Sequence, residues 1–165
     1  REALREALAG AGATWIATPA GDDIAALWRW RDSISPRVTA VRGGKLAEDI
    51  AVPVDRLADA IRGSAEIGAR HGVATMSWGH AGDGNLHSSF LISPGNTADR
   101  AGAEAACEEL FDLALALGGT ITGEHGIGLL KRSHLAEQLG PAGQRLNADI
   151  KRAFDPKGLL NPGKG

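Results

Sequence analysis

The chain has 165 residues, 43% of them hydrophobic and 23% charged, a composition typical of a globular domain with a core of its own. Its 18 Lys and Arg residues nearly balance its 20 Asp and Glu residues, which argues against bulk electrostatic binding of nucleic acid. The single cysteine excludes an internal disulfide framework and favours a cytoplasmic protein, with peripheral attachment to a membrane left open. No apolar run approaches the roughly 20 residues of a transmembrane segment.

Hydrophobic periodicity and turn residues predict the secondary structure. In chain order we expect a helix at 1–10, a strand at 14–18, a helix at 21–34, two strands around a Gly-Gly turn within 38–53, a helix at 54–72, strands at 73–78 and 86–92, a helix at 98–119, a strand within 120–132 that runs into a glycine-rich turn, and a helix at 142–154. Hairpins interleaved with helices predict an α+β fold, in which helices cover one face of an antiparallel sheet.

Two of the predicted helices carry an apolar stripe at helical spacing, and each stripe predicts the face that packs on the sheet. In helix 98–119 the stripe consists of Ala103, Cys107, Leu110, Ala114 and Leu117. In helix 54–72 it consists of Leu57, Ile61 and Ile67. We therefore expect Cys107 to be a small core residue.

The stretch "WGHAGDGNLHSSF" at residues 78–90 places two histidines around a turn of small and polar residues. If Asp83 and Gly84 form a two-residue type I′ turn, His80 and His87 stand directly opposite each other. Opposed residues share one face of the sheet with Cβ atoms about 4.5–5.5 Å apart, and two imidazoles at that separation can bind one metal ion. A pair of histidines without a ligand is the alternative.

A second motif, "GEHGIG" at residues 123–128, offers further ligands. Catalytic zinc often has three protein ligands, and two histidines with one glutamate form a known set. Glu124 would be the third ligand, and His125 would then be free to act as a base. The reverse assignment, with His125 as ligand and Glu124 behind it, stays open.

The other polar candidates have simpler interpretations. His71 lies at a helix end and His134 in a polar stretch, and we expect both to be structural. The stretch "RWRDSISPR" at residues 29–37 carries several arginines, which form a solvated face unless a neighbouring tryptophan buries one of them as an anion clamp.

Four motifs together resemble a known family. They are "EDIAVP" (48–53), "GHAGDGNLH" (79–87), "TGEHGIGLLKR" (122–132) and "FDPKGLLNPGK" (154–164). In this order they resemble the C-terminal cap domain of FAD-linked oxidases of the vanillyl-alcohol-oxidase superfamily. The most similar branch contains the glycolate oxidase large flavin subunit, D-lactate dehydrogenase and D-2-hydroxyglutarate dehydrogenase. The resemblance covers about the last two thirds of the chain.

The resemblance implies a ferredoxin-like α+β cap domain that closes over a flavin. Residues 1–165 would be this C-terminal domain, and the FAD-binding domain would lie outside the chain. Because the chain opens at Arg1 within a helical pattern, we expect a part of a longer protein that also lacks the start of the cap. The implied partners are the N-terminal FAD domain of the same parent chain and further oxidase subunits.

The resemblance also implies roles for individual residues. It assigns His80, His87 and Glu124 to a divalent metal, usually zinc, and His125 to proton abstraction. The parent enzyme would oxidise a small D-2-hydroxy acid to the 2-oxo acid with hydride transfer to FAD. This chain alone would not turn over substrate.

Substrate and cofactor contacts are implied in the same way. Arg31 and Lys45 match residues that bind the substrate carboxylate, and Ser89 stands where some relatives carry asparagine, so the hydroxy acid is not identified. Asn85 and Asn161 are the expected cofactor-binding residues. The rival hypothesis is a stand-alone metal-binding domain, either a hydrolase or a small-acid binder. An upstream flavin domain in the parent reading frame would support the oxidase, and a start codon near Arg1 would support the rival.

Overall fold

The computed structural model describes residues 2–14 and 20–164. The chain divides into two units, Arg1–Arg37 and Val38–Gly165. The first unit contains α1 (Glu2–Gly10) and α2 (Asp22–Asp32), which confirm the helices predicted at 1–10 and 21–34. The strand predicted at 14–18 lies outside the described residues, apart from Thr14 in a bend.

A third helix replaces the strand predicted to begin at residue 38. α3 covers Ile34–Arg42, although its β-branched Val38 and Val41 favour a strand by intrinsic preference. Pro36 lies in the first helical turn, where proline is tolerated, and Val38 is buried. Gly43 follows with a φ of 90°, the left-handed conformation that commonly ends a helix. Burial and helix-end geometry therefore outweigh the weak strand preference.

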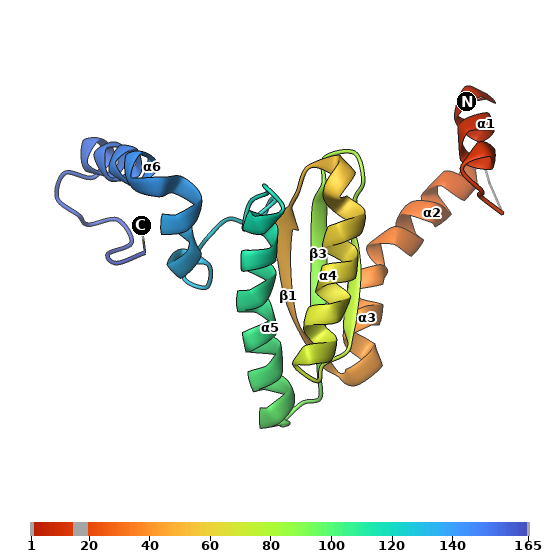
Figure 1. Cartoon of the computed structure of the whole chain (residues 1–165), viewed down its shortest axis with the longest axis horizontal. Helices are drawn as coiled ribbons and strands as arrows, with labels where there is room; N and C mark the ends of the chain where they lie inside the picture. Colours follow the sequence, from red (N-terminus) through yellow and green to blue (C-terminus); the bar gives the residue numbers. More distant parts are fainter. Residues whose placement is uncertain (1, 15–19, 165) are drawn as a thin grey trace. The chain divides into compact units, whose positions relative to one another are not determined.

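The second unit is built around an antiparallel sheet. Its elements are β1 (Gly44–Ala51), the 3₁₀ turn η1 (Val54–Arg56), α4 (Leu57–Arg70), β2 (Thr75–His80), β3 (Asn85–Ile92), α5 (Thr97–Ala116) and α6 (Arg132–Phe154). The strand order is β1-β3-β2, and α4 and α5 lie side by side across one face of the sheet (Figure 1). This arrangement confirms the predicted α+β fold with helices packed on an antiparallel sheet.

Where a fourth strand would pair with β1, the described residues form one isolated β-bridge. Thr120 pairs with Ala51 in antiparallel orientation, and its N–H donates to the Ala51 carbonyl at 2.7 Å. The segment after α5 is thereby placed beside β1, as the last strand of a ferredoxin-like sheet would be. The strand predicted within 120–132 is otherwise wrong, because the chain runs in bends and turns from Ile121 to the start of α6.

The core lies between the helices and the sheet. Its largest fully buried side chains include Ile50, Leu86, Phe90, Leu110 and Phe111. The stripe predicted for 98–119 is confirmed, since its first four members are buried and its last is partly buried against the core.

The stripe predicted for 54–72 is only partly right. Ile67 is buried and Leu57 packs against the core, but Ile61 is 44% exposed. Ala60 and Ser64 are buried instead, so the contact face of α4 is rotated by one residue from the predicted one. Small residues at these positions let the helix approach the sheet closely.

The helix predicted at 142–154 is confirmed as the second part of α6, and a further helical segment that begins at Arg132 precedes it. Gly140 has a φ of 60° and Pro141 follows, so the helical path is interrupted there. Within the described residues, no helix combines the length and the apolar character needed to cross a membrane.

Candidate metal centre

The predicted site residues of the sheet lie on the face opposite to α4 and α5. On β3, Ser88 donates a hydrogen bond to Ser64 of α4 at 3.0 Å, so Ser88 points to the helices. Successive strand residues point to opposite faces, and His87 and Ser89 therefore point away from them. Lys45 of β1 pairs with Leu91 of β3 and therefore lies on the same face as His87 and Ser89.

The histidines meet in a register that differs from the predicted one. Trp78 stands opposite His87, and His80 stands opposite Asn85. The turn is four residues long rather than two, and the Asp83 carboxylate accepts a hydrogen bond from the Asn85 N–H at 3.0 Å. A shift of two residues preserves the face, so His80 and His87 are diagonal neighbours with ring centroids 5.6 Å apart.

Glu124 completes a cluster with the two histidines. One ligand atom from each of His80, His87 and Glu124 lies within 4.8 Å of the others. The Glu124 Oε1 is 3.1 Å from Nε2 of His87 and 3.8 Å from Nε2 of His80. Two imidazoles and one carboxylate form a donor set that fits zinc, and the 52% exposed Glu124 side chain leaves room for a further ligand.

The protonation of His87 also suits a ligand. Burial lowers the pKa of this imidazole, and the nearby His125 and His80 lower it as well, while Glu124 and Asp49 act in the opposite direction. The net effect favours the neutral ring, which is the form that binds a metal ion.

His125 lies beside the cluster without joining it. Its ring stacks on that of His87 with centroids 5.2 Å apart, and its side chain is 54% exposed. Its Nδ1 is 3.4 Å from Oδ1 of Asp49. The geometry favours Glu124 as the third ligand and leaves the His125 imidazole facing the surface.

Two residues outside the predicted set, Asp49 and Lys131, hold the loop that carries Glu124 and His125. Asp49 is fully buried on β1, and its carboxylate accepts hydrogen bonds from the backbone N–H groups of residues 123–125. Lys131 is 2% exposed and donates to Oδ1 of Asp49 at 2.6 Å. Burial would raise the pKa of Asp49, but the hydrogen bonds from Lys131 and from the loop outweigh it and hold this pKa well below its usual range.

The sequence contained a signal for this pair. Asp49 lies within "EDIAVP", where it interrupts a strand whose neighbours Ile50 and Val52 are core residues. Lys131 lies at the end of "TGEHGIGLLKR". A charge inside a buried strand needs a partner, and Lys131 is one of the few cations among the motif residues.

Lys45 and Ser89 come together on the same face. The Lys45 ammonium lies 4.8 Å from the centroid of the Trp78 ring, a cation–π distance. Lys45 stands opposite Leu91 and Trp78 opposite His87, so this contact crosses β3 at Ser89. Ser89 is fully buried, and its Oγ has no hydrogen-bond partner among the described residues. Burial lowers the pKa of Lys45.

Asn85 lies at the edge of the cluster. It is 5% exposed, and its Oδ1 has no hydrogen-bond partner within the described part of the chain. The backbone of Gly123 packs directly against this amide, since a Cβ at Gly123 would lie 2.3 Å from Oδ1.

The other two predicted residues lie outside the sheet and the 122–126 loop. Arg31 lies in α2 of the first unit, where its guanidinium is 5.9 Å from the centroid of the Trp28 ring and 3.2 Å from Asp32. Asn161 lies in the exposed C-terminal tail with a φ of 48°. The expected structural roles of His71 and His134 fit their contacts with carboxylates of α5.

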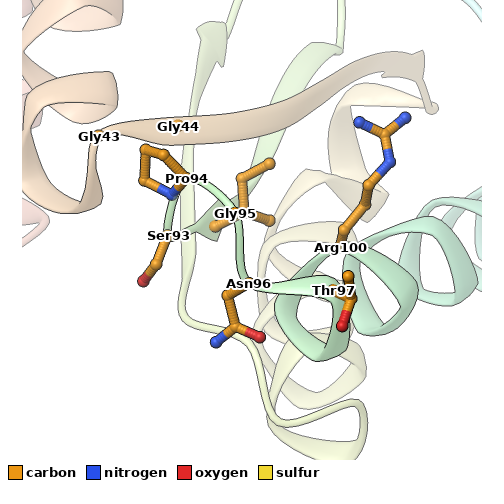
Figure 2. Close-up of a pocket in the computed structure, with 9 residues that line it drawn as sticks. Gly43, Gly44, Ser93, Pro94, Gly95, Asn96, Thr97 and Arg100 are labelled. Atoms are coloured by element: carbon orange, nitrogen blue, oxygen red, sulfur yellow. The ribbon is translucent and has the colours of Figure 1, made fainter.

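A hollow of about 430 Å³ lies at the opposite end of β1 and β3 from the His80–Asn85 turn (Figure 2). It is lined by residues 43–44, 92–97 and Arg100. The side-chain Oδ1 of Asn96 caps α5 by accepting hydrogen bonds from the N–H groups of Ala98 and Asp99, and Arg100 pairs with Glu104. These polar groups bond within α5, so we keep the histidine cluster, and not this hollow, as the candidate site.

Fold and site together define an α+β domain with a cluster of two histidines and one glutamate that could hold a metal ion, on the face of the sheet opposite to α4 and α5. The family model described as FAD linked oxidases, C-terminal domain, matches residues 1–165, and the chain belongs to this family. This membership confirms the resemblance drawn from the four motifs.

Three relatives illustrate the similarity. The glycolate oxidase subunit GlcD of Bacillus subtilis is 37% identical over 139 residues, which are 84% of this chain and 30% of the relative. A D-lactate dehydrogenase of Archaeoglobus fulgidus is 43% identical over 116 residues, 70% of this chain and 25% of the relative. The glycolate oxidase subunit GlcD of Escherichia coli K12 is 30% identical over 164 residues, 99% of this chain and 33% of the relative. The chain thus spans a third or less of the length of each.

Proposed function

We propose that this domain forms the metal and substrate site of a flavin-dependent oxidoreductase that converts a small D-2-hydroxy acid, of the glycolate or D-lactate type, to the 2-oxo acid. The observation that carries the proposal is the cluster of His80, His87 and Glu124 with His125 beside it. Family membership and the names of the relatives support flavin chemistry. They also favour an oxidoreductase over a stand-alone metal-binding domain.

His80, His87 and Glu124 would hold a divalent ion, with zinc as the expected metal. A bound ion of this kind acts as a Lewis acid that binds the carboxylate and hydroxyl of a 2-hydroxy acid and makes the hydroxyl more acidic. The three side chains come from two neighbouring strands and one loop, so the ligand spacing is set by the sheet register and by the loop.

His125 would accept the proton of the substrate hydroxyl. It lies against His87 and is exposed toward the face on which substrate would bind. A neutral imidazole is a suitable base near pH 7. The hydride from the substrate carbon would pass to the FAD held by another part of the protein.

Lys45 and Ser89 are proposed to contact the substrate. Both lie with His87 on the face of the sheet opposite to α4 and α5, and the Lys45 ammonium can pair with a carboxylate. Arg31 is proposed as a second carboxylate ligand because a guanidinium binds carboxylates through two hydrogen bonds. Asn85 and Asn161 remain proposals for cofactor contact, and the unpartnered Oδ1 of Asn85 supports the first.

The proposed partners are a flavin-binding domain of the same parent chain and further oxidase subunits. The relatives are three to five times longer than the segments that match, and two of them are named as an oxidase subunit. α6 carries an apolar stripe in which Leu146 is 60%, Ile150 49% and Phe154 83% exposed. Burial of this stripe against the flavin-binding domain would remove it from water. A cytoplasmic location stays a prediction.

The test compares Glu124→Gln with His125→Asn in the full-length flavoprotein, with zinc content, flavin content and kcat measured on each. Loss of a ligand should empty the metal site in Glu124→Gln. Loss of a base should lower kcat of His125→Asn by about 10²–10⁴-fold with metal and flavin retained. Zinc lost from His125→Asn but kept in Glu124→Gln would reverse the two roles.

A further inference from the structure

The Asp49 carboxylate lies at the centre of the loop that carries Glu124 and His125. Its Oδ2 accepts hydrogen bonds from three consecutive backbone N–H groups, those of Gly123 at 2.7 Å, Glu124 at 2.6 Å and His125 at 3.0 Å. Successive N–H groups that converge on one point form an anion-binding nest. In this loop the anion is a side chain of the protein itself.

The other carboxylate oxygen is held by Lys131. The Lys131 ammonium donates to Oδ1 of Asp49 at 2.6 Å and to the Asp49 carbonyl oxygen at 2.8 Å. The Lys131 side chain is 3% exposed and that of Asp49 is fully buried. The lysine therefore balances the buried charge and fixes the carboxylate in one orientation, with Oδ2 toward the loop.

This loop conformation solves a geometric problem. Glu124 and His125 are adjacent, and adjacent side chains of an extended segment point to opposite sides. Here the backbone curls around Asp49, so that Glu124 reaches His87 at 3.1 Å while the His125 ring stacks on His87 at 5.2 Å. Two neighbouring residues can therefore act at one place.

We propose that Asp49, held by Lys131, is the positioning residue that sets both the metal ligand Glu124 and the base His125. This inference rests on the proposed function for the roles of those two residues. The shape of the loop is a separate property, which can be measured without metal or turnover.

Glu48 provides a matched control. Its carboxylate lies 3.2 Å from the Lys131 ammonium, and its side chain is 14% exposed. Glu48 is therefore a second acidic partner of the same lysine on the same strand, but the loop N–H groups bond to Asp49. A purely structural role of these ion pairs would make Glu48→Gln and Asp49→Asn equivalent.

The experiment uses the full-length protein and its Glu48→Gln and Asp49→Asn variants. Co²⁺ titration followed by the visible spectrum measures metal affinity, and hydrogen–deuterium exchange measures protection of the amides in residues 121–127. We expect Asp49→Asn to weaken Co²⁺ binding by about 10–100-fold, the usual effect of losing an outer-shell partner, and to speed exchange in the loop. Glu48→Gln should leave both close to wild type.

A double variant guards against misfolding of Asp49→Asn. Asp49→Asn/Lys131→Met leaves neither buried charge unpaired and should recover much of the denaturation midpoint. It should not recover Co²⁺ affinity or loop protection, because the carboxylate is still absent. Recovery of wild-type affinity would overturn the proposal, and so would equal behaviour of Asp49→Asn and Glu48→Gln.

The proposed function and this inference can fail separately. If wild-type protein binds no Co²⁺ but Asp49→Asn alone loses loop protection, the metal site falls and the positioning of the loop by Asp49 is supported. If wild-type protein binds Co²⁺ and Asp49→Asn keeps both affinity and protection, the positioning role falls and the metal site stands.

Discussion

Gly123→Ala is the smallest change that tests the packing of the loop at residues 122–126, which carries Glu124 and His125. A Cβ at this position would lie 2.3 Å from Oδ1, 2.5 Å from Cγ and 2.9 Å from Nδ2 of Asn85. Atoms at these separations overlap, and Asn85 is 5% exposed with little space to retreat. Either the Asn85 amide or the 122–126 backbone has to move.

The size of the effect follows from the two ways of relieving the overlap. Overpacking of a single methyl group in a well-packed site costs typically 1–3 kcal/mol, and we expect a free energy of unfolding lower by about 2 kcal/mol. If the loop moves, the N–H groups of Glu124 and His125 also leave Asp49, and metal affinity falls by about 10-fold or more.

The assay is urea denaturation together with metal titration, and Gly82→Ala is the matched control. A Cβ at Gly82 meets no atom within 4 Å, so this variant should lie within about 0.5 kcal/mol of wild type. Asn85→Ala in combination with Gly123→Ala removes the overlap, so the double variant should be more stable than the sum of the single effects. A Gly123→Ala protein as stable as Gly82→Ala, or purely additive effects with Asn85→Ala, would refute the packing argument.

Two further predictions concern stability. Leu110→Ala should lower the free energy of unfolding by about 2–5 kcal/mol because Leu110 is fully buried, whereas Ile61→Ala, at 44% exposure, should change the urea midpoint little; equal effects would contradict the observed core. Lys151 and backbone N–H groups donate to Asp155 and lower its pKa from 3.8 to about 2, so its stabilisation is complete above about pH 4 and lost as the pH falls to about 2. The stability difference between wild type and Asp155→Asn should shrink over that interval, and a difference that is constant with pH would exclude this role.

The face of the sheet that carries the candidate site could be predicted because an error of two residues in the length of the turn does not change the face to which a strand residue points. The two-residue turn expected at Asp83-Gly84 is wrong, and His80 stands opposite Asn85 rather than His87. The error is two residues, one full period of a strand, so both histidines still point to one face. An error of one residue would have placed them on opposite faces.

Other features could not be predicted because long-range contacts decide them. The register of β2 and β3 is tied to β1 through Gly84, whose carbonyl accepts from the Val52 N–H at 3.1 Å. Gly84 has a φ of 76°, and a Cβ there would lie 1.9 Å from the Val52 carbonyl oxygen. A hairpin rule based on Asp-Gly alone contains no information about this neighbouring strand.

The missing fourth strand and the shape of the loop that carries Glu124 and His125 have one cause. β1 is an edge strand of the described sheet, and a following strand would normally donate its N–H groups to the β1 backbone. That pairing occurs at Thr120 and Ala51, but the Ile121 N–H donates to the Gln138 side chain and the N–H groups of residues 123–125 donate to the Asp49 side chain. An extended strand would point only every second N–H group toward β1, so the convergence of three consecutive N–H groups on one carboxylate requires the chain to curl, and the curl presents Glu124 and His125. Hydrophobic periodicity predicts a strand within 120–132 because the residues at the start of this segment are apolar. The rest of the segment curls because its N–H groups bond to the buried Asp49 carboxylate, and this curl places Glu124 and His125 beside the histidines.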